Sequence, residues 1–346
     1  MSHDSEVISF DSYNLFLCFI ITAGFQYTGF IIAYVAQFDK ITDLWGASNF
    51  VILQLVLLFH YGTFSLRAVV VAAIVSIWGI RLSGYLFYRV LKMGHDERFD
   101  GARSFVPFFI FWTFQIAWVW IVSLPPVLIA GIEASLADNP NKENISVTWY
   151  EVGAWVVALF GVFLESTADL QKNAFKNNPD NRGRFCDAGV WSLSRHPNYL
   201  GDILLWWGMF VAGTPLYSVS PGAWGAIGSP LFITLLLMFA SGLPTTEPKA
   251  DQKYGSTSGY ADYLDSTPIL CLFPPALFRK CGPTSKSVFC CEWGFYRGNV
   301  KIGTQESDTS LTTEEEDSSR SHQGDALLNE RKSTYSASYE SIKSSS

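Results

Sequence analysis

Residues 105–131 read FVPFFIFWTFQIAWVWIVSLPPVLIAG and contain no charged side chain. A helix needs about 20 consecutive apolar residues to cross the hydrocarbon core of a bilayer, and this run is long enough. Residues 15–36 form a second run without a charge. A water-soluble domain would scatter lysine, glutamate and aspartate through its helices, so the two runs predict a protein with several membrane-spanning helices.

The composition of the whole chain favours the same class. Of the 346 residues, 49% are hydrophobic, 16% are aromatic and only 16% are charged, a balance typical of membrane proteins. The formal net charge of −7 comes largely from the C-terminal tail, where residues 314–317 are all acidic, and it indicates no nucleic-acid partner. We predict an all-α fold: a polytopic membrane helix bundle of about seven transmembrane helices, with a disordered C-terminal tail.

Seven stretches of the chain are candidate spans. They cover residues 15–36, 47–61, 66–90, 105–131, 148–170, 199–217 and 224–243. Pro125 and Pro126 should kink or end the fourth helix, because proline cannot donate a backbone hydrogen bond. Gly208 and Gly213 should allow another helix to approach the sixth span closely.

The basic residues predict how the chain is oriented. They gather between spans three and four and between spans five and six, and cytosolic loops carry such an excess. Seven spans then place residues 1–14 in the lumen and the C-terminus in the cytosol. The expected location is an endomembrane, that of the endoplasmic reticulum. The sequon Asn144-Ile145-Ser146 would be lumenal. Met1 begins an acidic segment without the basic start of a signal peptide, so the first span should remain in the mature protein.

The domain boundaries follow from this topology. A membrane domain should cover residues 15–276, and residues 277–346 should form a disordered cytosolic tail rich in serine, threonine and glutamate. The six cysteines have no metal-ligand spacing, and those on the cytosolic side should be thiols. Cys290 and Cys291 suit palmitoylation, but two free thiols are an equally good interpretation.

The first group of candidate site residues lies where the fifth span reaches the cytosol. Glu165, Asp169, Lys172 and Lys176 follow one another at spacings of four, three and four, which places them on one helix face. Carboxylates there would accept hydrogen bonds from a ribose or carboxamide, and the lysines would bind phosphate. The alternative is a self-paired, solvated helix end. An unpaired carboxylate near an apolar span is costly, which favours a functional role for Glu165 and Asp169.

The second group is denser and precedes the sixth span. Arg195 and His196 come directly before Pro197, which suits the first turn of a helix, so both would lie beside the free amides of a helix N-terminus, where phosphate binds. Asn198, Tyr199 and Asp202 then offer hydrogen bonds and an aromatic face to a planar ring. An ordinary basic loop is the alternative.

Two further groups also reach the cytosolic side. Glu247 and Tyr263 follow the last span, in a region whose aromatic residues and lysines are also typical of interfacial anchors. In the third span, Arg81 and Tyr85 lie one helical turn apart, with Tyr88 nearby. An arginine inside a membrane needs a partner or a water-filled cavity, unless it snorkels to the interface, and the tyrosines are candidate proton donors.

Soluble nucleotide folds and zinc chemistry are unsupported by motifs. The sequence contains no Gly-rich strand-to-helix fingerprint, no phosphate-binding Gly-Lys-Ser/Thr loop, no His-Glu-x-x-His and no Cys-x-x-Cys. No metal site is predicted. A nucleotide would have to bind among helix ends at the cytosolic face.

Several of these segments, taken in order, resemble the steroid 5-alpha-reductase-like membrane proteins, in the branch defined by domain of unknown function 1295. The resemblance covers about residues 15–276. It rests on the segments 81–82, 94–100, 165–172, 189–191, 194–202, 241–247, 259–263 and 273–274. The characterised steroid reductases are similar to this chain only in its C-terminal half.

The resemblance implies a helix bundle that binds NADPH at its cytosolic side and takes a lipid-like substrate from the membrane. We therefore expect an NADPH-dependent reductase of a conjugated carbon–carbon double bond, with Tyr85 as the first candidate proton donor and Tyr88 as the second. The expected cofactor-binding residues are Glu165, Asp169, Lys172, Arg195, His196, Asn198, Tyr199, Asp202, Glu247 and Tyr263.

Two other functions stay open from the sequence. Isoprenylcysteine methyltransferases also carry an Arg-His-Pro-x-Tyr-x-Gly run, which residues 195–201 match, so a methyltransferase that uses S-adenosylmethionine is the alternative enzyme. A seven-helix transporter or receptor is the third interpretation. It would need polar residues along a path through the bilayer, whereas the ionisable residues cluster at the cytosolic ends and leave the lumenal halves nearly free of charge.

Overall fold

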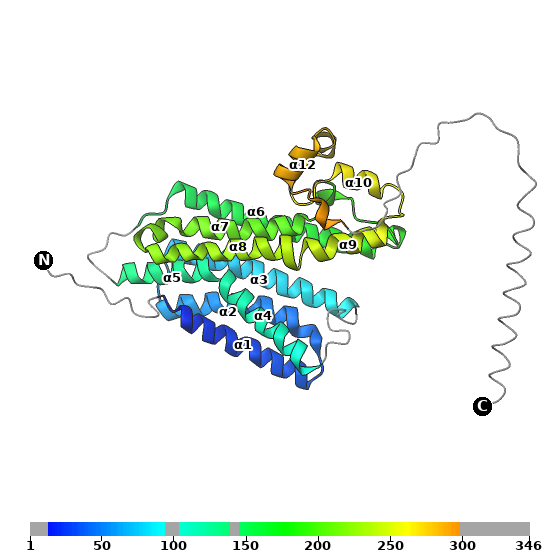
Figure 1. The fold of residues 1–346 in the computed structure, drawn as a ribbon. Coiled ribbons are helices and arrows are strands. Elements are labelled where there is room, and N and C mark those ends of the chain that lie inside the picture. The colour runs from blue at the N-terminus through cyan, green and yellow to red at the C-terminus, as the bar shows by residue number, and fades with distance from the viewer. Residues whose placement is uncertain (1–12, 94–103, 139–144, 298–346) are drawn as a thin grey trace, which may run out of the picture. The chain divides into compact units, whose positions relative to one another are not determined.

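The computed structural model describes residues 13–93, 104–138 and 145–297 (Figure 1). None of these residues forms a strand, so the all-α prediction is confirmed. The long helices are α1 (Leu15–Val35), α2 (Thr42–Tyr61), α3 (Leu66–Met93), α4 (Phe105–Val122), α6 (Trp149–Asn177) and α7 (Pro197–Val219). The shorter ones are α5 (Leu124–Ala137), α8 (Gly228–Leu235), α9 (Leu243–Tyr254), α10 (Tyr260–Ser266), α11 (Pro275–Phe278) and α12 (Pro283–Cys290).

Six helical segments are long and apolar enough to cross a membrane. They are Leu15–Val35, Thr42–Tyr61, Leu66–Lys92, Phe105–Val122, Trp149–Asn177 and Pro221–Tyr254. The outer faces of these segments expose large apolar side chains such as Phe163 and Leu235, as the lipid-facing surface of an integral membrane protein does. The predicted sixth span, α7, is not among the six although it has 23 residues.

Helix α7 nevertheless runs the length of the bundle. It is antiparallel to α6, because Gly201 packs against Gly161 near one end and Gly208 packs against Ala154 further along. Just after α7 ends, Ser220 hydrogen-bonds to Tyr13, which precedes α1. In the described chain, seven helical segments therefore traverse the bundle, in agreement with the predicted count.

The predicted fourth span is two helices. Helix α4 ends at Val122 and α5 begins at Leu124 with the two prolines in its first turn. Proline is tolerated there because the first-turn amides have no intrahelical acceptor. The prediction that Pro125 and Pro126 break the helix is confirmed, but the apolar run continues as a separate short helix packed against α2, α3 and α7.

Helices α6 and α7 make the most extensive helix–helix contact in the described bundle. A Cβ atom on Gly201 would lie 2.6 Å from the carbonyl oxygen of Gly161, and one on Gly208 would lie 2.8 Å from that of Ala154. Small residues let membrane helices approach at backbone distance. The predicted role of Gly208 is confirmed, whereas Gly213 instead lies against the ring of Tyr217 on its own helix.

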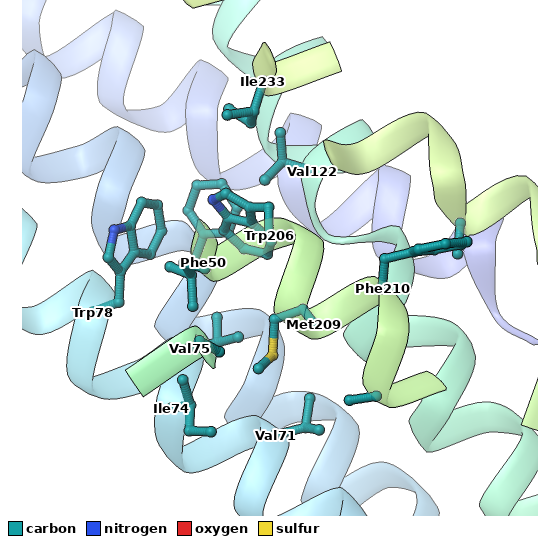
Figure 2. Close-up of a cluster of buried hydrophobic side chains, with 14 of the residues drawn as sticks. Phe50, Val71, Ile74, Val75, Trp78, Val122, Trp206, Met209, Phe210 and Ile233 are labelled. Atoms are coloured by element: carbon teal, nitrogen blue, oxygen red, sulfur yellow. The ribbon is translucent and has the colours of Figure 1, made fainter. Parts of the chain in front are cut away.

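The apolar core lies between this helix pair and the first helices. Figure 2 shows Phe50, Trp78 and Trp206 packed together, and their rings meet edge-on or tilted, with centroids 5.1–5.6 Å apart. The three rings come from α2, α3 and α7. Aromatic pairs in such geometries add about 0.5–1.5 kcal/mol beyond the burial of their area.

The two ends of the bundle are defined by polar contacts. At one end, the ammonium of Lys92 donates to Asn177 Oδ1 at 2.7 Å, so α3 and α6 end on the same side, as the charge pattern predicted. At the opposite end, Arg67 is fully enclosed and pairs with Glu133 and Glu151. The expectation that the predicted lumenal halves are nearly free of charge was therefore wrong. Three charged side chains are buried there, and they are tolerated because the arginine and its two carboxylates neutralise one another.

The chain after residue 276 differs from the predicted disordered tail. Residues 277–297 include the end of α11, all of α12 and the short helix η7 (Gly294–Tyr296), and Tyr296 is buried. The helices α9, α10 and α12 gather at one end of the bundle (Figure 1). The tail from residue 298, residues 1–12 and the sequon residue Asn144 lie outside the described residues.

All six cysteines are free thiols, as predicted for the cytosolic side. Burial raises the pKa of the Cys271 thiol to about 12, since neighbouring Cys290 and Cys291 add like charge to the cost of desolvation. Cys290 is buried and Cys291 is partly exposed. Palmitoylation of this pair stays a prediction.

The α6–α7 contact predicts a position-specific response to substitution. Gly201→Val should lower stability by about 1–3 kcal/mol, because the added side chain collides with the backbone of α6. Gly153→Val is the matched control, since a Cβ on Gly153, also in α6, would meet nothing within 4 Å. Thermal unfolding in detergent measures both, and equal unfolding temperatures for the two variants would contradict the close contact.

Candidate functional site

A cavity of about 260 Å³ lies at the end of the bundle where α6 stops and α7 begins. We call it the basic cavity. Its lining residues are Lys172, Phe175, Lys176, Arg184, Phe185, Cys186, Trp191, Arg195, His196, Thr246, Glu247, Lys249, Ala250, Lys253, Tyr254, Tyr260 and Tyr263. Of the predicted cofactor-binding residues, it brings together Lys172, Arg195, His196, Glu247 and Tyr263.

Positive charge and aromatic rings dominate the basic cavity. Six lysines and arginines line it against a single carboxylate, Glu247. The ammonium of Lys172 lies 3.9 Å from the centre of the Trp191 ring, a cation–π contact. The ring of Phe185 meets those of Tyr260 and Tyr263, with centroids 5.3 and 5.0 Å away. These groups suit a ligand that has both a planar ring and negative charge.

The floor of the basic cavity is a buried ionic network around Arg195. Its guanidinium donates to both carboxylate oxygens of Glu292, at 2.8 and 2.9 Å, and Glu247 lies 3.5 Å away. His196 Nε2 lies 2.7 Å from Glu247 Oε1. Because Glu247 is held ionised by Arg195, Nε2 carries the proton and donates, and the neutral ring keeps Nδ1 as an acceptor.

The structure confirms where Arg195 and His196 lie and changes the role expected of Arg195. Helix α7 begins at Pro197, so both residues do precede a helix N-terminus. However, the side chain of Arg195 is only 3% exposed and is already paired with two carboxylates. Arg195 is therefore already neutralised by its partners, whereas four other cations of the cavity are exposed: Lys176, Arg184, Lys249 and Lys253.

Glu165 and Asp169 lie on one face of α6, as predicted, and that face is turned toward α3. Arg81 pairs with Glu165, and its Nη1 lies 2.7 Å from Asp169 Oδ2. The indole of Trp78 donates to Glu165 Oε2 at 2.9 Å. The side chain of Arg81 is 19% exposed, so it is paired within the bundle and does not snorkel to the interface. We call these four residues the arginine cluster.

The two candidate proton donors lie in different surroundings. The hydroxyl of Tyr85 donates to the backbone carbonyl of Asp169 at 3.3 Å, which places it beside the arginine cluster. Tyr88 is 51% exposed and its ring lies 6.0 Å from the ammonium of Lys92. Of the two, only Tyr85 lies next to other predicted site residues.

The first two turns of α7 connect the basic cavity with the arginine cluster. The ring of Tyr199 stacks on His196, with centroids 4.9 Å apart. Asp202 accepts a hydrogen bond from the indole of Trp206 at 3.0 Å and interacts electrostatically with Arg81. Asn198 Oδ1 is enclosed and accepts no hydrogen bond from the described residues. An enclosed acceptor without a donor suits a ligand that supplies an N–H.

Tyr263 has a structural role besides lining the cavity. Its hydroxyl donates to the carbonyl oxygen of Trp191 at 2.8 Å, which ties α10 to the loop before α7. The neighbouring Tyr260 donates to Asp251 at 2.9 Å. Tyr263 lines the cavity, and its expected role in binding a cofactor stays a prediction.

Sequence reasoning did not single out Phe185 and Glu292 as residues of the site, and it named Trp191 only as part of the segment 189–191 that carries the family resemblance. Phe185 lies in a loop with no periodic pattern. Glu292 lies beyond the expected end of the membrane domain, although a lone carboxylate within the apolar run Cys290–Trp293 is a signal that could have found it. Among the described residues, no group of three or more histidine, cysteine, aspartate or glutamate side chains could hold a metal ion.

The family model described as "Protein of unknown function (DUF1295)" matches residues 29–267. The chain belongs to this family. The match spans the basic cavity and the arginine cluster, while Glu292 lies beyond it. No curated protein and no solved structure matches the chain.

The buried His196 predicts a dependence of stability on pH. Burial lowers the pKa of His196, and the hydrogen bond and charge of Glu247 oppose this without overcoming it. The folded protein therefore resists protonation of His196, and stability should fall as the pH drops from about 6.5, the pKa in an unfolded chain, toward the lower folded value.

Thermal unfolding between pH 7.5 and 5.5, a range spanning the unfolded pKa of about 6.5, measures this effect. His196→Gln keeps a donor toward Glu247 but does not titrate, so its unfolding temperature should fall less on acidification than that of the wild type. His60→Gln, at the exposed His60, is the control and should behave like the wild type. Parallel pH profiles for the wild type and His196→Gln would show that His196 is not the group responsible.

Proposed function

We propose that this protein is a membrane-embedded, NADPH-dependent reductase of a carbon–carbon double bond conjugated to a carbonyl in a lipid-like substrate. The observation that carries the proposal is the continuity of two regions along α6. Lys172, in the basic cavity, is one helical turn from Asp169, in the arginine cluster. A dinucleotide is long enough to extend from one region into the other.

The residues fit the chemical groups of NADPH. Lys172, Lys176, Arg184, Lys249 and Lys253 supply the positive charge that its phosphates require. The rings of Phe185, Tyr254 and Tyr260 suit an adenine. The enclosed oxygen of Asn198 suits the amino group of a carboxamide. When bound, the cofactor would supply a hydride.

The chain's own residues would complete the reaction. Addition of a hydride to a conjugated double bond raises the electron density on the carbonyl oxygen, so a hydrogen-bond donor aimed at that oxygen stabilises the transition state. Tyr85 is the donor that we propose. Its hydroxyl donates to the backbone carbonyl of Asp169, whose carboxylate pairs with Arg81, so the proton that it would deliver lies beside the arginine cluster. The apolar outer faces of the spans would give a lipid direct access from the membrane.

The charge of the cavity also separates this proposal from the methyltransferase alternative. S-adenosylmethionine has no phosphate and carries a sulfonium cation, which the five lysines and arginines other than the paired Arg195 would repel. A protein that bound S-adenosylmethionine and not NADPH would reverse the ranking. A substrate flux across proteoliposomes without nucleotide would instead favour the transporter.

The predicted topology supports a location for the site. Positive loops face the cytosol, so the basic cavity would open to cytosolic NADPH, with the C-terminus on the same side, in a membrane such as that of the endoplasmic reticulum. The expected partners are the substrate and membrane lipids.

Binding of NADPH to the purified protein tests the cavity. Lys176→Ala and Lys253→Ala should each weaken NADPH binding about tenfold or more, because a charged hydrogen bond contributes about 1.5–3 kcal/mol. The same variants should affect NADH less if they contact the additional 2′-phosphate. Lys280→Ala removes an exposed lysine outside the cavity and should leave the affinity unchanged. Equal affinities for all three variants would refute the cavity as the nucleotide site.

The assignment of Tyr85 as the proton donor can be tested by measuring NADPH oxidation by membranes in the presence of a panel of enones. Tyr85→Phe should lower turnover about 100-fold or more and leave NADPH binding intact, since a general acid contributes about 10²–10⁴ to a rate. Asn198→Ala and Asp169→Ala should instead weaken the cofactor complex. If Tyr88→Phe lowered turnover and Tyr85→Phe did not, Tyr88 would be the donor.

A further inference from the structure

The segment from Pro283 to Arg297 forms a strap that lies next to the basic cavity but beyond the family match. It contains α12 and η7. One side of the strap is attached to the protein: Glu292 holds Arg195, Cys290 and Tyr296 are buried, and Arg297 lies 3.7 Å from Asp251.

The opposite side of the strap is apolar and exposed. Phe289 is 73% exposed and Phe295 is 63% exposed. Val288, which precedes Phe289 in α12, is 66% exposed. Two phenylalanines and a valine in contact with water would be costly, at about 25 cal/mol for each Å² of apolar surface. Exposed apolar side chains of this size on one short segment indicate a partner.

The neighbouring membrane span identifies the partner. Leu231, Leu235 and Phe239 recur every fourth residue along the last span and are all exposed, so they form one outward, lipid-facing stripe. The ring of Phe239 stacks on that of Phe295, with centroids 6.2 Å apart, and on that of Trp293 at 5.7 Å. The rings of Trp293 and Phe295 therefore pack against the lipid-facing stripe at Phe239.

We propose that the strap docks on the lipid bilayer, with Phe289 and Phe295 inserted at the membrane interface and Trp293 at its edge. Aromatic side chains are enriched at this depth of a membrane. Because Glu292 is part of the same segment, insertion of one side holds the other side on Arg195. The membrane surface thereby fixes the floor of the basic cavity. The proposal does not depend on which ligand the cavity binds.

Photochemical labelling in lipid nanodiscs tests the contact. A phosphatidylcholine with a diazirine in its acyl chain should label the peptide 288–296 as well as the stripe at Leu235 and Phe239. The loop around Phe185, which lines the cavity, should stay unlabelled. Labelling of the stripe without any in the strap would overturn the proposal and leave a protein partner or a second copy as the occupant.

Proteolysis in the same nanodiscs tests whether membrane insertion holds the strap in place. Phe289→Ser combined with Phe295→Ser should release the strap and speed tryptic cleavage after Lys286 and Arg297 several-fold. The matched control is Phe59→Ser combined with Phe64→Ser, which removes two exposed, mutually contacting rings from another part of the bundle. Lipid labelling of the strap with unchanged cleavage in the first variant would overturn the claim that the membrane holds it in place.

Discussion

The contact between α6 and α7 at Gly161 and Gly201 is the constraint on which the rest of the site depends. A membrane offers little hydrophobic driving force for association of two helices, so close packing of small residues has to supply it. Because the backbones touch there, Glu165 and Asp202 are directed toward the same arginine, and the loop that joins the helices folds over Lys172. The basic cavity lies at the open end of this pair.

Charge inside the bundle follows a single rule. Each of three enclosed arginines pairs with two carboxylates: Arg67 with Glu133 and Glu151, Arg81 with Glu165 and Asp169, and Arg195 with Glu247 and Glu292. An unpaired charge in this environment would be strongly unfavourable, and loss of one partner of a buried pair typically costs about 3–5 kcal/mol. The first set ties together α3, α5 and α6, the second ties α3 to α6, and the third ties the strap to the start of α7.

The sequence predicted which site residues share a helix face and where α7 begins, but not which distant residues they pair with. Periodicity placed Glu165 and Asp169 on one face because helical spacing alone decides that, and Pro197 marked the start of α7 because proline suits a first turn. Neither pattern revealed which helix that face meets. The pairing of Arg81 with Glu165 and Asp169 joins residues 84 and 88 positions apart, and Glu292 reaches Arg195 across 97 positions. Spacing along one helix carries no information about partners at such separations.

The sequence by itself determined that the chain is an all-α membrane protein, where its long apolar stretches lie, and which end of the bundle collects the basic residues, because hydropathy and charge act locally. The tertiary structure decided which charged side chains are paired inside the bundle and which are exposed to a ligand in the cavity. It left Lys176, Lys249 and Lys253 exposed around a cavity while enclosing Arg195. It also gave the strap an attached side and an apolar side. These outcomes depend on the packing of distant helices in a medium of low dielectric, where a charge is stable only beside its partner.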